Sequence, residues 1–290
     1  MTKKLTAAYL TVATAIISLA YIGITGCSTA STESDSTSTQ PSFTLTGNPI
    51  SATPHGDPIQ ADGGNYPRYE LHIGQSYIIP GYKNSTMGDY TVTPKALGVA
   101  HNRQWADLTV TFSNGDVFAY RAYQKIDSET ASATLGGRTS ILLAATHGSG
   151  PEATVTLGIY TLNPTGALDR DSPQRQLFAR TKPHGTQSWD IPLNRNFWSG
   201  TLTVSGGLGD QSDGDFSVAV AMNAASSRTS SDANLGLSAS IDCYPGDSYT
   251  VSPVGTFTLK GYTPSGEAPP TDPAKVGYSP GQMRVQLRWS

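Results

Sequence analysis

The chain has 290 residues, a formal net charge of −3 and only 14% charged residues. No run rich in Lys and Arg follows residue 27. A protein that binds nucleic acid needs a basic face, so the composition excludes nucleic acid from the expected partners.

The first 26 residues have the pattern of a secretory signal peptide. Lys3 and Lys4 precede an uncharged, mostly apolar stretch over residues 5–26, which ends in small residues. A basic start, an apolar core and a small-residue end are typical of a cleaved signal. The stretch is also long enough to cross a bilayer as an uncleaved helix. We predict a signal peptide over residues 1–26.

The stretch ends in Ile24-Thr25-Gly26-Cys27, which resembles the lipobox of bacterial lipoproteins. The resemblance implies cleavage before Cys27, a diacylglycerol on its sulfur and an acylated amino group. Two or three acyl chains hold a protein firmly to a membrane. The expected location is therefore the cell membrane or outer membrane, with the body facing the extracytoplasmic side. Losing Lys3 and Lys4 with the signal changes the formal net charge from −3 to −5.

A tether is expected between the lipid and the folded body. In the segment 28–42, ten of fifteen residues are Ser or Thr, and none has an aliphatic side chain larger than Ala. Such a segment cannot bury enough apolar area to offset its chain entropy. The segment 47–67 continues with Pro and Gly and is expected to be irregular, so the predicted tether covers residues 27–67.

From Tyr69 onward, short runs rich in Val, Ile, Thr, Tyr and Phe alternate with turn residues. Asn114-Gly115 lies between two such runs and predicts a tight hairpin. The C-terminal run alternates Met283, Val285, Leu287 and Trp289 with polar residues, which predicts a strand with one buried face. The run Arg175–Thr181 is also assigned to a strand. The pattern predicts an all-β protein, an antiparallel sandwich of the immunoglobulin-like or jelly-roll type.

The number of predicted strands exceeds that of one immunoglobulin-like domain. We expect two packed units, a first over residues 68–127 and a larger one over residues 128–290, with the break near the charged stretch 124–130. One enlarged sandwich is the alternative.

Two stretches resemble known sandwiches. Residues 131–224 resemble galactose-binding-like jelly rolls, the relatives of carbohydrate-binding modules, in the order of the segments Val155–Tyr160, Gln176–Phe178, Asp190–Ile191 and Leu202–Val204. The Trp and acidic residue that follow the last strand in that pattern are absent here. Residues 69–125 resemble the telokin-like immunoglobulin domains of other bacterial lipoproteins.

Aromatic residues with polar neighbours are the first candidate site. Trp198 with Arg195 and Asn196, and Trp189 nearby, form a set in which a ring stacks on a sugar and polar groups bond its hydroxyls. The alternative is that Trp198 packs on the sandwich edge. Since neighbours on a strand point to opposite faces, at most one of Phe197 and Trp198 belongs to the core.

A second candidate is a calcium site. Asp210, Asp213 and Asp215 share one Gly-rich loop, and calcium prefers oxygen ligands on a flexible turn. The alternative is an acidic turn without an ion. Apart from calcium, the sequence suggests no named cofactor.

Single reactive side chains carry weaker signals. His147 and His184 are candidates for a shared metal or acid–base role, with solvated surface histidines as the alternative. Cys243 lies in an alternating run and is expected to be a small buried hydrophobe.

The preferred function is non-catalytic: a lipid-anchored surface protein whose body binds an envelope glycan or a protein partner. The first alternative is a cell-wall glycan hydrolase that pairs an Asp with Glu70, Glu129 or Glu152. The second is a structural or access-blocking surface lipoprotein.

Overall fold

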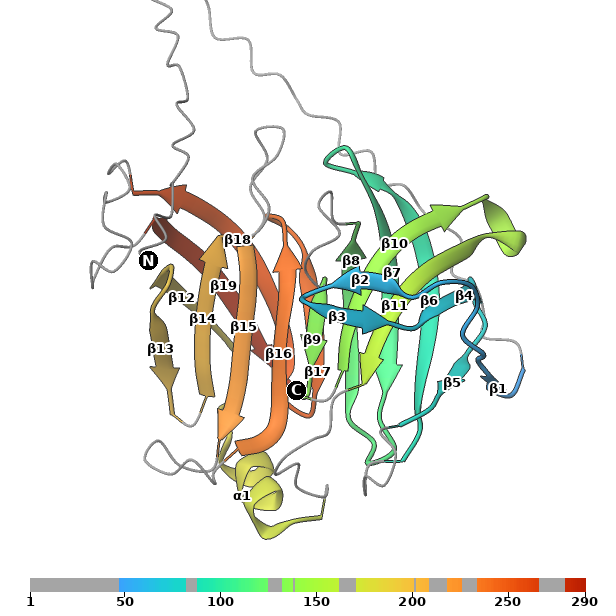
Figure 1. Ribbon diagram of the computed structural model, residues 1–290. Helices are drawn as coiled ribbons and strands as arrows, with labels where there is room; N and C mark the ends of the chain where they lie inside the picture. Colours follow the sequence, from blue (N-terminus) through green and yellow to red (C-terminus); the bar gives the residue numbers. More distant parts are fainter. Residues whose placement is uncertain are drawn as a thin grey trace, which may run out of the picture. The chain divides into compact units, whose positions relative to one another are not determined.

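Two large β-sheets face each other in the computed structural model (Figure 1). The structure describes residues 47–81, 88–124, 132–137, 139–161, 171–200, 202–208, 218–225, 234–265 and 280–290. The predicted signal peptide, Cys27, the tether segment 28–42 and the three aspartates of the predicted calcium loop lie outside these ranges.

The nine-stranded sheet holds both the first and the last described strand. Its order is β1 (Ile50–Ser51), β5 (Tyr77–Ile79), β6 (Tyr90–Ala100), β7 (Arg103–Thr111), β8 (Val117–Tyr123), β17 (Ser248–Ser252), β18 (Gly255–Pro264), β19 (Gly281–Trp289) and β12 (Thr186–Pro192). Neighbours in this sheet are antiparallel, except that β1 runs parallel to β5.

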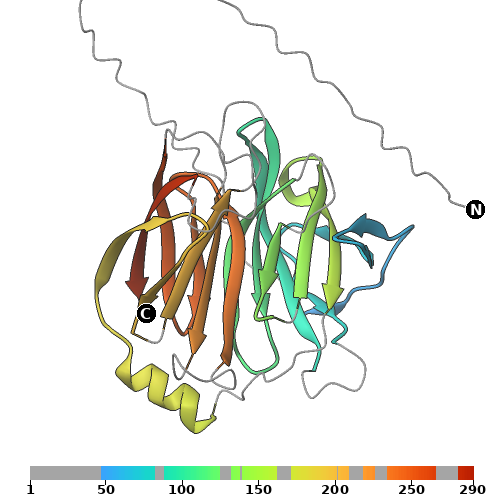
Figure 2. The same cartoon turned by 60° about the vertical axis from the view of Figure 1, so that its left-hand side comes forward.

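The eight-stranded sheet is antiparallel throughout its described strands. Its order is β13 (Asn196–Ser199), β14 (Leu202–Leu208), β15 (Val218–Ala225), β16 (Asn234–Cys243), β9 (Ala133–Leu135), β10 (Thr139–His147), β11 (Thr154–Thr161) and β4 (Arg68–His72). A short 3₁₀ turn, Gly150–Glu152, joins β10 to β11. The expected all-β sandwich is confirmed, and Figure 2 shows its two layers.

One hydrophobic core fills the space between the sheets. It includes buried side chains from Tyr69 near the start of the body to Trp289 at its end. On β19 the residues Met283, Val285, Leu287 and Trp289 are buried and alternate with exposed or half-buried polar ones, as the sequence predicts. This strand is hydrogen-bonded on both sides, to β18 and to β12.

The expected division into units 68–127 and 128–290 does not match the strand pairing. The range 68–127 supplies β4 to the eight-stranded sheet and β5–β8 to the nine-stranded sheet. Across the expected boundary, β4 pairs with β11 and β8 pairs with β17. Because each sheet covers the apolar face of the other, both ranges share a single core, which is the enlarged sandwich that was the alternative.

The predicted hairpin at Asn114-Gly115 is present between β7 and β8. Gly115 has a φ of 83°, which glycine adopts without steric cost. The Asn114 side chain accepts a hydrogen bond from the Asp116 N–H at 3.1 Å, and this contact closes the turn.

The expectation of a strand over Arg175–Thr181 is wrong, because this run belongs to the helix α1 (Pro173–Thr181). The run lacks Val and Ile, and its Gln, Arg, Leu and Ala residues favour helix. Ser172 caps the helix by accepting from the Arg175 N–H, and Pro173 occupies the first turn, where its missing N–H costs nothing. The jelly-roll resemblance requires a strand over Gln176–Phe178, so the chain departs from that pattern here.

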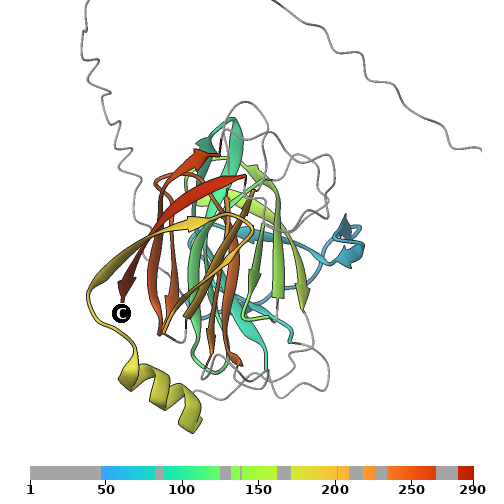
Figure 3. The same cartoon turned by 90° about the vertical axis from the view of Figure 1, so that its left-hand side faces the viewer.

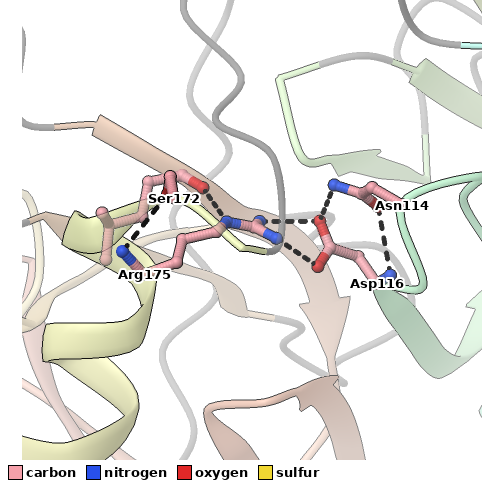
Figure 4. A network of polar contacts seen from close by, with 5 residues as sticks. Asn114, Asp116, Ser172 and Arg175 are labelled. Carbon is pink, nitrogen blue, oxygen red and sulfur yellow. Dashed lines mark hydrogen bonds and ion pairs between the residues drawn. The ribbon is translucent and has the colours of Figure 1, made fainter.

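A buried ion pair fixes α1 against one end of the sandwich (Figure 4). The Arg175 guanidinium donates to both carboxylate oxygens of Asp116, at 2.8 and 2.7 Å, and to the Leu235 carbonyl at 2.9 Å. Asn114 holds the other side of the same carboxylate at 2.9 Å. The hairpin turn and the helix are thus linked through one residue, Asp116.

The tether was expected to reach residue 67, but its last part is folded. The hairpin formed by β2 (Ile59–Ala61) and β3 (Gly64–Tyr66) packs on the outer face of the eight-stranded sheet, where Ala61 and Tyr66 cover Leu142. Gly158 makes this approach possible, because a Cβ there would lie 3.0 Å from that of Tyr66.

Candidate functional site

A pocket of about 420 Å³ lies on the outer face of the nine-stranded sheet. It is built over β6, β7, β8 and β17, whose alternate residues point away from the core. The residues that line it are Lys95, Asp107, Leu108, Thr109, Ala119, Tyr120, Arg121, Gly246, Asp247, Ser248 and Thr250. The volume is within the range of small-molecule sites, but charged and hydroxyl groups dominate the lining.

The small side chain of Ala119 explains the hollow. Ala119 lies directly opposite Thr109 on β7 and opposite Thr250 on β17. The Ala119 methyl group extends less far from the sheet than the threonine side chains on either side, so the surface is hollowed at this position. The backbone of the floor at Ala119 is held by strand pairing on both sides.

Arg121 and Asp107 form one wall as a two-point ion pair. Arg121 donates from Nε to Asp107 Oδ1 at 2.8 Å and from Nη2 to Oδ2 at 3.1 Å. Partial burial by itself lowers the pKa of Arg121, but the hydrogen bonds and charge of Asp107 outweigh it and raise the pKa. The guanidinium has five N–H groups, so donors remain beyond the two that Asp107 uses.

The Trp105 ring supports Arg121 from beneath. The Arg121 guanidinium carbon lies 3.7 Å from the ring centroid, a cation–π contact. On the neighbouring strand the opposite residue is Gly98, where a Cβ would lie 2.6 Å from the ring. Glycine at this position therefore allows the indole to lie flat and hold Arg121 in place.

Asp247 forms the opposite wall and is also held by internal contacts. Its carboxylate accepts from the Tyr123 hydroxyl and from the Tyr244 N–H, both at 2.9 Å. Burial and the nearby Asp247 charge raise the pKa of Tyr123, so this hydroxyl keeps its proton. Tyr244 in turn stacks on His101, with ring centroids 3.9 Å apart. Both carboxylates of the pocket are thus fixed in position before any ligand arrives.

Lys95 lies at a β-bulge at the rim. The pairing of β6 with β7 shifts between Pro94 and Ala96, so Lys95 has no partner residue on β7. It is exposed, and its ammonium has three donors for a ligand.

Of the predicted sugar-binding residues, Trp189 points into the sandwich and Trp198 away from it, whereas Asn196 and Trp198 share one side of β13. Trp189 on β12 and Phe197 on β13 point inward and contact each other, with ring centroids 5.5 Å apart. Asn196 and Trp198 lie on the opposite side of β13, where Trp198 is 38% exposed. The expectation that at most one of Phe197 and Trp198 is core is confirmed. Arg195 is exposed in the turn between β12 and β13. These two strands are the edge strands of their sheets, on the side of the sandwich that faces the viewer in Figure 3.

Cys243 is buried in β16 as expected, and burial raises the pKa of its thiol well above the usual range. His147 ends β10 and contacts the Thr156 hydroxyl at 3.3 Å, whereas His184 precedes β12 in the other sheet. Within the described ranges no group of three or more His, Cys, Asp or Glu side chains is arranged to hold a metal ion.

The glutamates considered for hydrolysis are separate. Glu70 on β4 accepts from Arg68 at 3.2 Å, and Glu152 lies in the 3₁₀ turn. Glu129 is outside the described residues.

The chain was compared with known proteins, and neither the protein-family models, the curated proteins nor the solved structures gave a match. In the part of the chain that the structure describes, no helix has the length and apolarity needed to span a membrane.

Sequence reasoning missed the pocket although its signal is present. The loop of this hairpin has three residues, 113–115, and counting outward from its centre, Asn114, pairs Thr109 with Ala119 and Asp107 with Arg121. A carboxylate and a guanidinium opposite each other at outward positions, next to an alanine, would have indicated a polar hollow.

Proposed function

We propose that this protein is a lipid-anchored bacterial surface protein whose β-sandwich binds a glycan of the cell envelope in the pocket on the nine-stranded sheet. The lipobox-like sequence supports anchoring through Cys27, and the Ser/Thr tether supports display of the body away from the membrane.

The observation that carries the binding proposal is the pre-organised polar lining of the pocket. A sugar ring presents several hydroxyls, each a donor and an acceptor, at fixed angles. Arg121, Asp107 and Asp247 offer donors and acceptors whose positions are set by Trp105 and Tyr123. Little side-chain entropy is lost on binding to groups that are already held, which favours affinity for such a ligand.

Binding is tested by filling the pocket. Ala119→Leu places a larger side chain on its floor without touching the core, because Ala119 points outward. We expect the purified mature protein to bind envelope polysaccharides on a glycan array and Ala119→Leu to lose that binding. The matched control is Ala219→Leu, an outward alanine on the central strand β15 of the other sheet.

The control separates a filled pocket from a damaged fold. Ala219→Leu and Trp198→Ala are both expected to bind as the unmodified protein does. If Trp198→Ala lost binding while Ala119→Leu bound fully, the binding site would lie at β13 rather than in the pocket. That result would contradict the proposal.

Anchoring is tested in the producing cell. Cells grown with labelled palmitate are expected to incorporate label into the protein and to lose it in Cys27→Ser, with the protein moving from the membrane fraction to the soluble one. Equal labelling of both forms would contradict the lipid anchor.

A further inference from the structure

Two rows of polar side chains cross the outer face of the nine-stranded sheet, starting at the pocket. In the first row, residues directly opposite each other on neighbouring strands are Thr109, Thr250, Thr256, Arg288 and Thr186, with Ala119, the floor of the pocket, between Thr109 and Thr250. The second row consists of Ser248, Thr258, Gln286 and Ser188. We call these the polar rows.

Hydroxyls within the polar rows are bonded to one another. Ser248 and Thr258 share a hydrogen bond of 2.8 Å, and Thr250 and Thr256 share one of 2.9 Å. Each hydroxyl has one donor and two acceptor positions, so these bonds fix the side chains and leave capacity for a ligand. The rows therefore present oriented hydroxyl groups rather than freely rotating ones.

The same face carries an excess of positive charge. Among the described strand residues and the pocket lining, this face carries the cations Lys95, Arg103, Arg121, Lys260, Arg284 and Arg288 against the carboxylates Asp107, Asp190 and Asp247. Over all described residues Lys and Arg equal Asp and Glu in number, eleven of each, so the described residues outside this face have an excess of acidic groups.

Three of these cations are not neutralised internally. Arg121 pairs with Asp107 and Arg284 pairs with Asp190, the latter at 2.7 Å. Lys95, Lys260 and Arg288 form no ion pair within the described ranges. Like Lys95, Lys260 lies at a β-bulge, between Leu259 and Gly261 of β18.

The length of the rows exceeds what one sugar can occupy. From β7, through β8, β17, β18 and β19, to β12 there are five strand spacings, which at the usual separation amount to about 24 Å. A single ring fills the pocket, whereas the rows continue beyond it for several ring lengths.

We infer that the ligand is an extended glycan chain bearing acidic groups, with one sugar in the pocket and the rest lying along the polar rows toward β12. Sugar hydroxyls bond the hydroxyls of the rows, and carboxylate or phosphate groups of the chain contact Lys95, Lys260 and Arg288. This inference rests on the proposed function, since it names the ligand class of the same site.

The test uses oligomers of galacturonic acid, from monomer to octamer, and the same oligomers with methyl-esterified carboxylates. We expect the affinity of the mature protein to rise with chain length and to fall on esterification. A phosphorylated neutral oligosaccharide, used alongside, distinguishes phosphate from carboxylate as the acidic group.

Variants far from the pocket test whether the protein binds a glycan chain or only a single sugar. Lys260→Gln and Arg288→Gln are each expected to weaken octamer binding by about fivefold, the upper range for an exposed ion pair, and to leave monomer binding unchanged. Arg180→Gln, an exposed cation on α1, is the matched control and is expected to have no effect.

The outcomes separate this inference from the proposed function. Affinity independent of length, with Lys260→Gln and Arg288→Gln binding normally and Ala119→Leu not binding, would overturn the chain inference and leave pocket binding intact. Absence of binding to every glycan would overturn both. Equal binding of polyglutamate, which has the charge but no hydroxyls, would show simple ion exchange and overturn the inference.

Discussion

Arg175 and Asp116 are the most buried ion pair among the described residues, with side chains 4% and 2% exposed. Taking both charges out of water is costly, and the cost is offset because every oxygen of the carboxylate is bonded. The free energy of unfolding therefore falls more when one partner of such a pair is replaced than when both are replaced by apolar residues.

Asp116→Asn leaves the Arg175 guanidinium buried without its counter-charge. We expect the free energy of unfolding to fall by about 3–5 kcal/mol, measured by urea denaturation. In the double variant Asp116→Asn/Arg175→Met the buried charge is gone, so part of the loss should be recovered. A double variant less stable than the single one would show that the charges themselves stabilise the fold.

Gly98 acts on the candidate site at the residue scale without touching a ligand. A Cβ at this position would lie 2.6 Å from the Trp105 ring, which supports Arg121. The glycine thus controls the position of a charged group on the next strand but one.

Gly98→Ala is expected to displace the indole, weaken glycan binding and change the near-UV circular dichroism of tryptophan. The ring belongs to a small buried cluster with Tyr123 and Tyr244, apart from the main core, so the midpoint of thermal unfolding should shift by only a few degrees, about the effect of 1 kcal/mol in a domain of this size. Gly207→Ala, on β14 of the other sheet, is the matched control, because the nearest atom to its added Cβ lies at 3.8 Å, an ordinary contact distance. Unaltered binding by Gly98→Ala would show that Trp105 does not hold Arg121 for the ligand.

At the scale of elements, periodicity predicts strands better than it predicts short helices. The alternation of β19 and the Asn-Gly turn of β7–β8 are local signals, and both are confirmed. Helix α1 has only nine residues, and its apolar side consists mainly of Phe178, so no helical period appears in the sequence. Its burial depends on Asp116 and Leu235, which are distant in sequence.

Removing residues 281–290 is expected to prevent folding. Four buried side chains of β19 each contribute about 2 kcal/mol, a total comparable with the whole stability of an ordinary domain. The loss would also expose the edges of β12 and β18. Soluble expression and circular dichroism measure the result; removal of Ser290 alone should leave the fold intact, and a folded protein without β19 would contradict its central role.

At the scale of the whole molecule, polar contacts join the two sheets at points within the apolar core. The Tyr90 hydroxyl on β6 contacts the hydroxyls of Thr139 and Thr161, at 3.0 and 2.9 Å, on two strands of the other sheet. Burial raises the pKa of Tyr90 to about 12, and these hydrogen bonds only partly oppose that effect.

This raised pKa predicts a loss of stability in alkali. The folded state holds the phenolic proton more tightly than the unfolded state, so this contribution is fully present below pH 10 and is lost as the pH rises toward 12. Tyr90→Phe should reduce the slope of unfolding free energy against pH in that window by about 1.4 kcal/mol per pH unit. An unchanged slope would show that folding does not raise the pKa of the Tyr90 hydroxyl.

The all-β class, the hairpin turn and the buried face of the last strand follow from the sequence alone, because each depends on residues within a few positions of one another. The N-terminal interpretation also comes from the sequence alone. The single core, the helix and the pocket depend on the tertiary structure. They arise where β4 meets β11, where Arg175 meets Asp116, and where β17 lies beside β8. Such pairings join residues separated by about sixty positions or more, and a local pattern does not encode them.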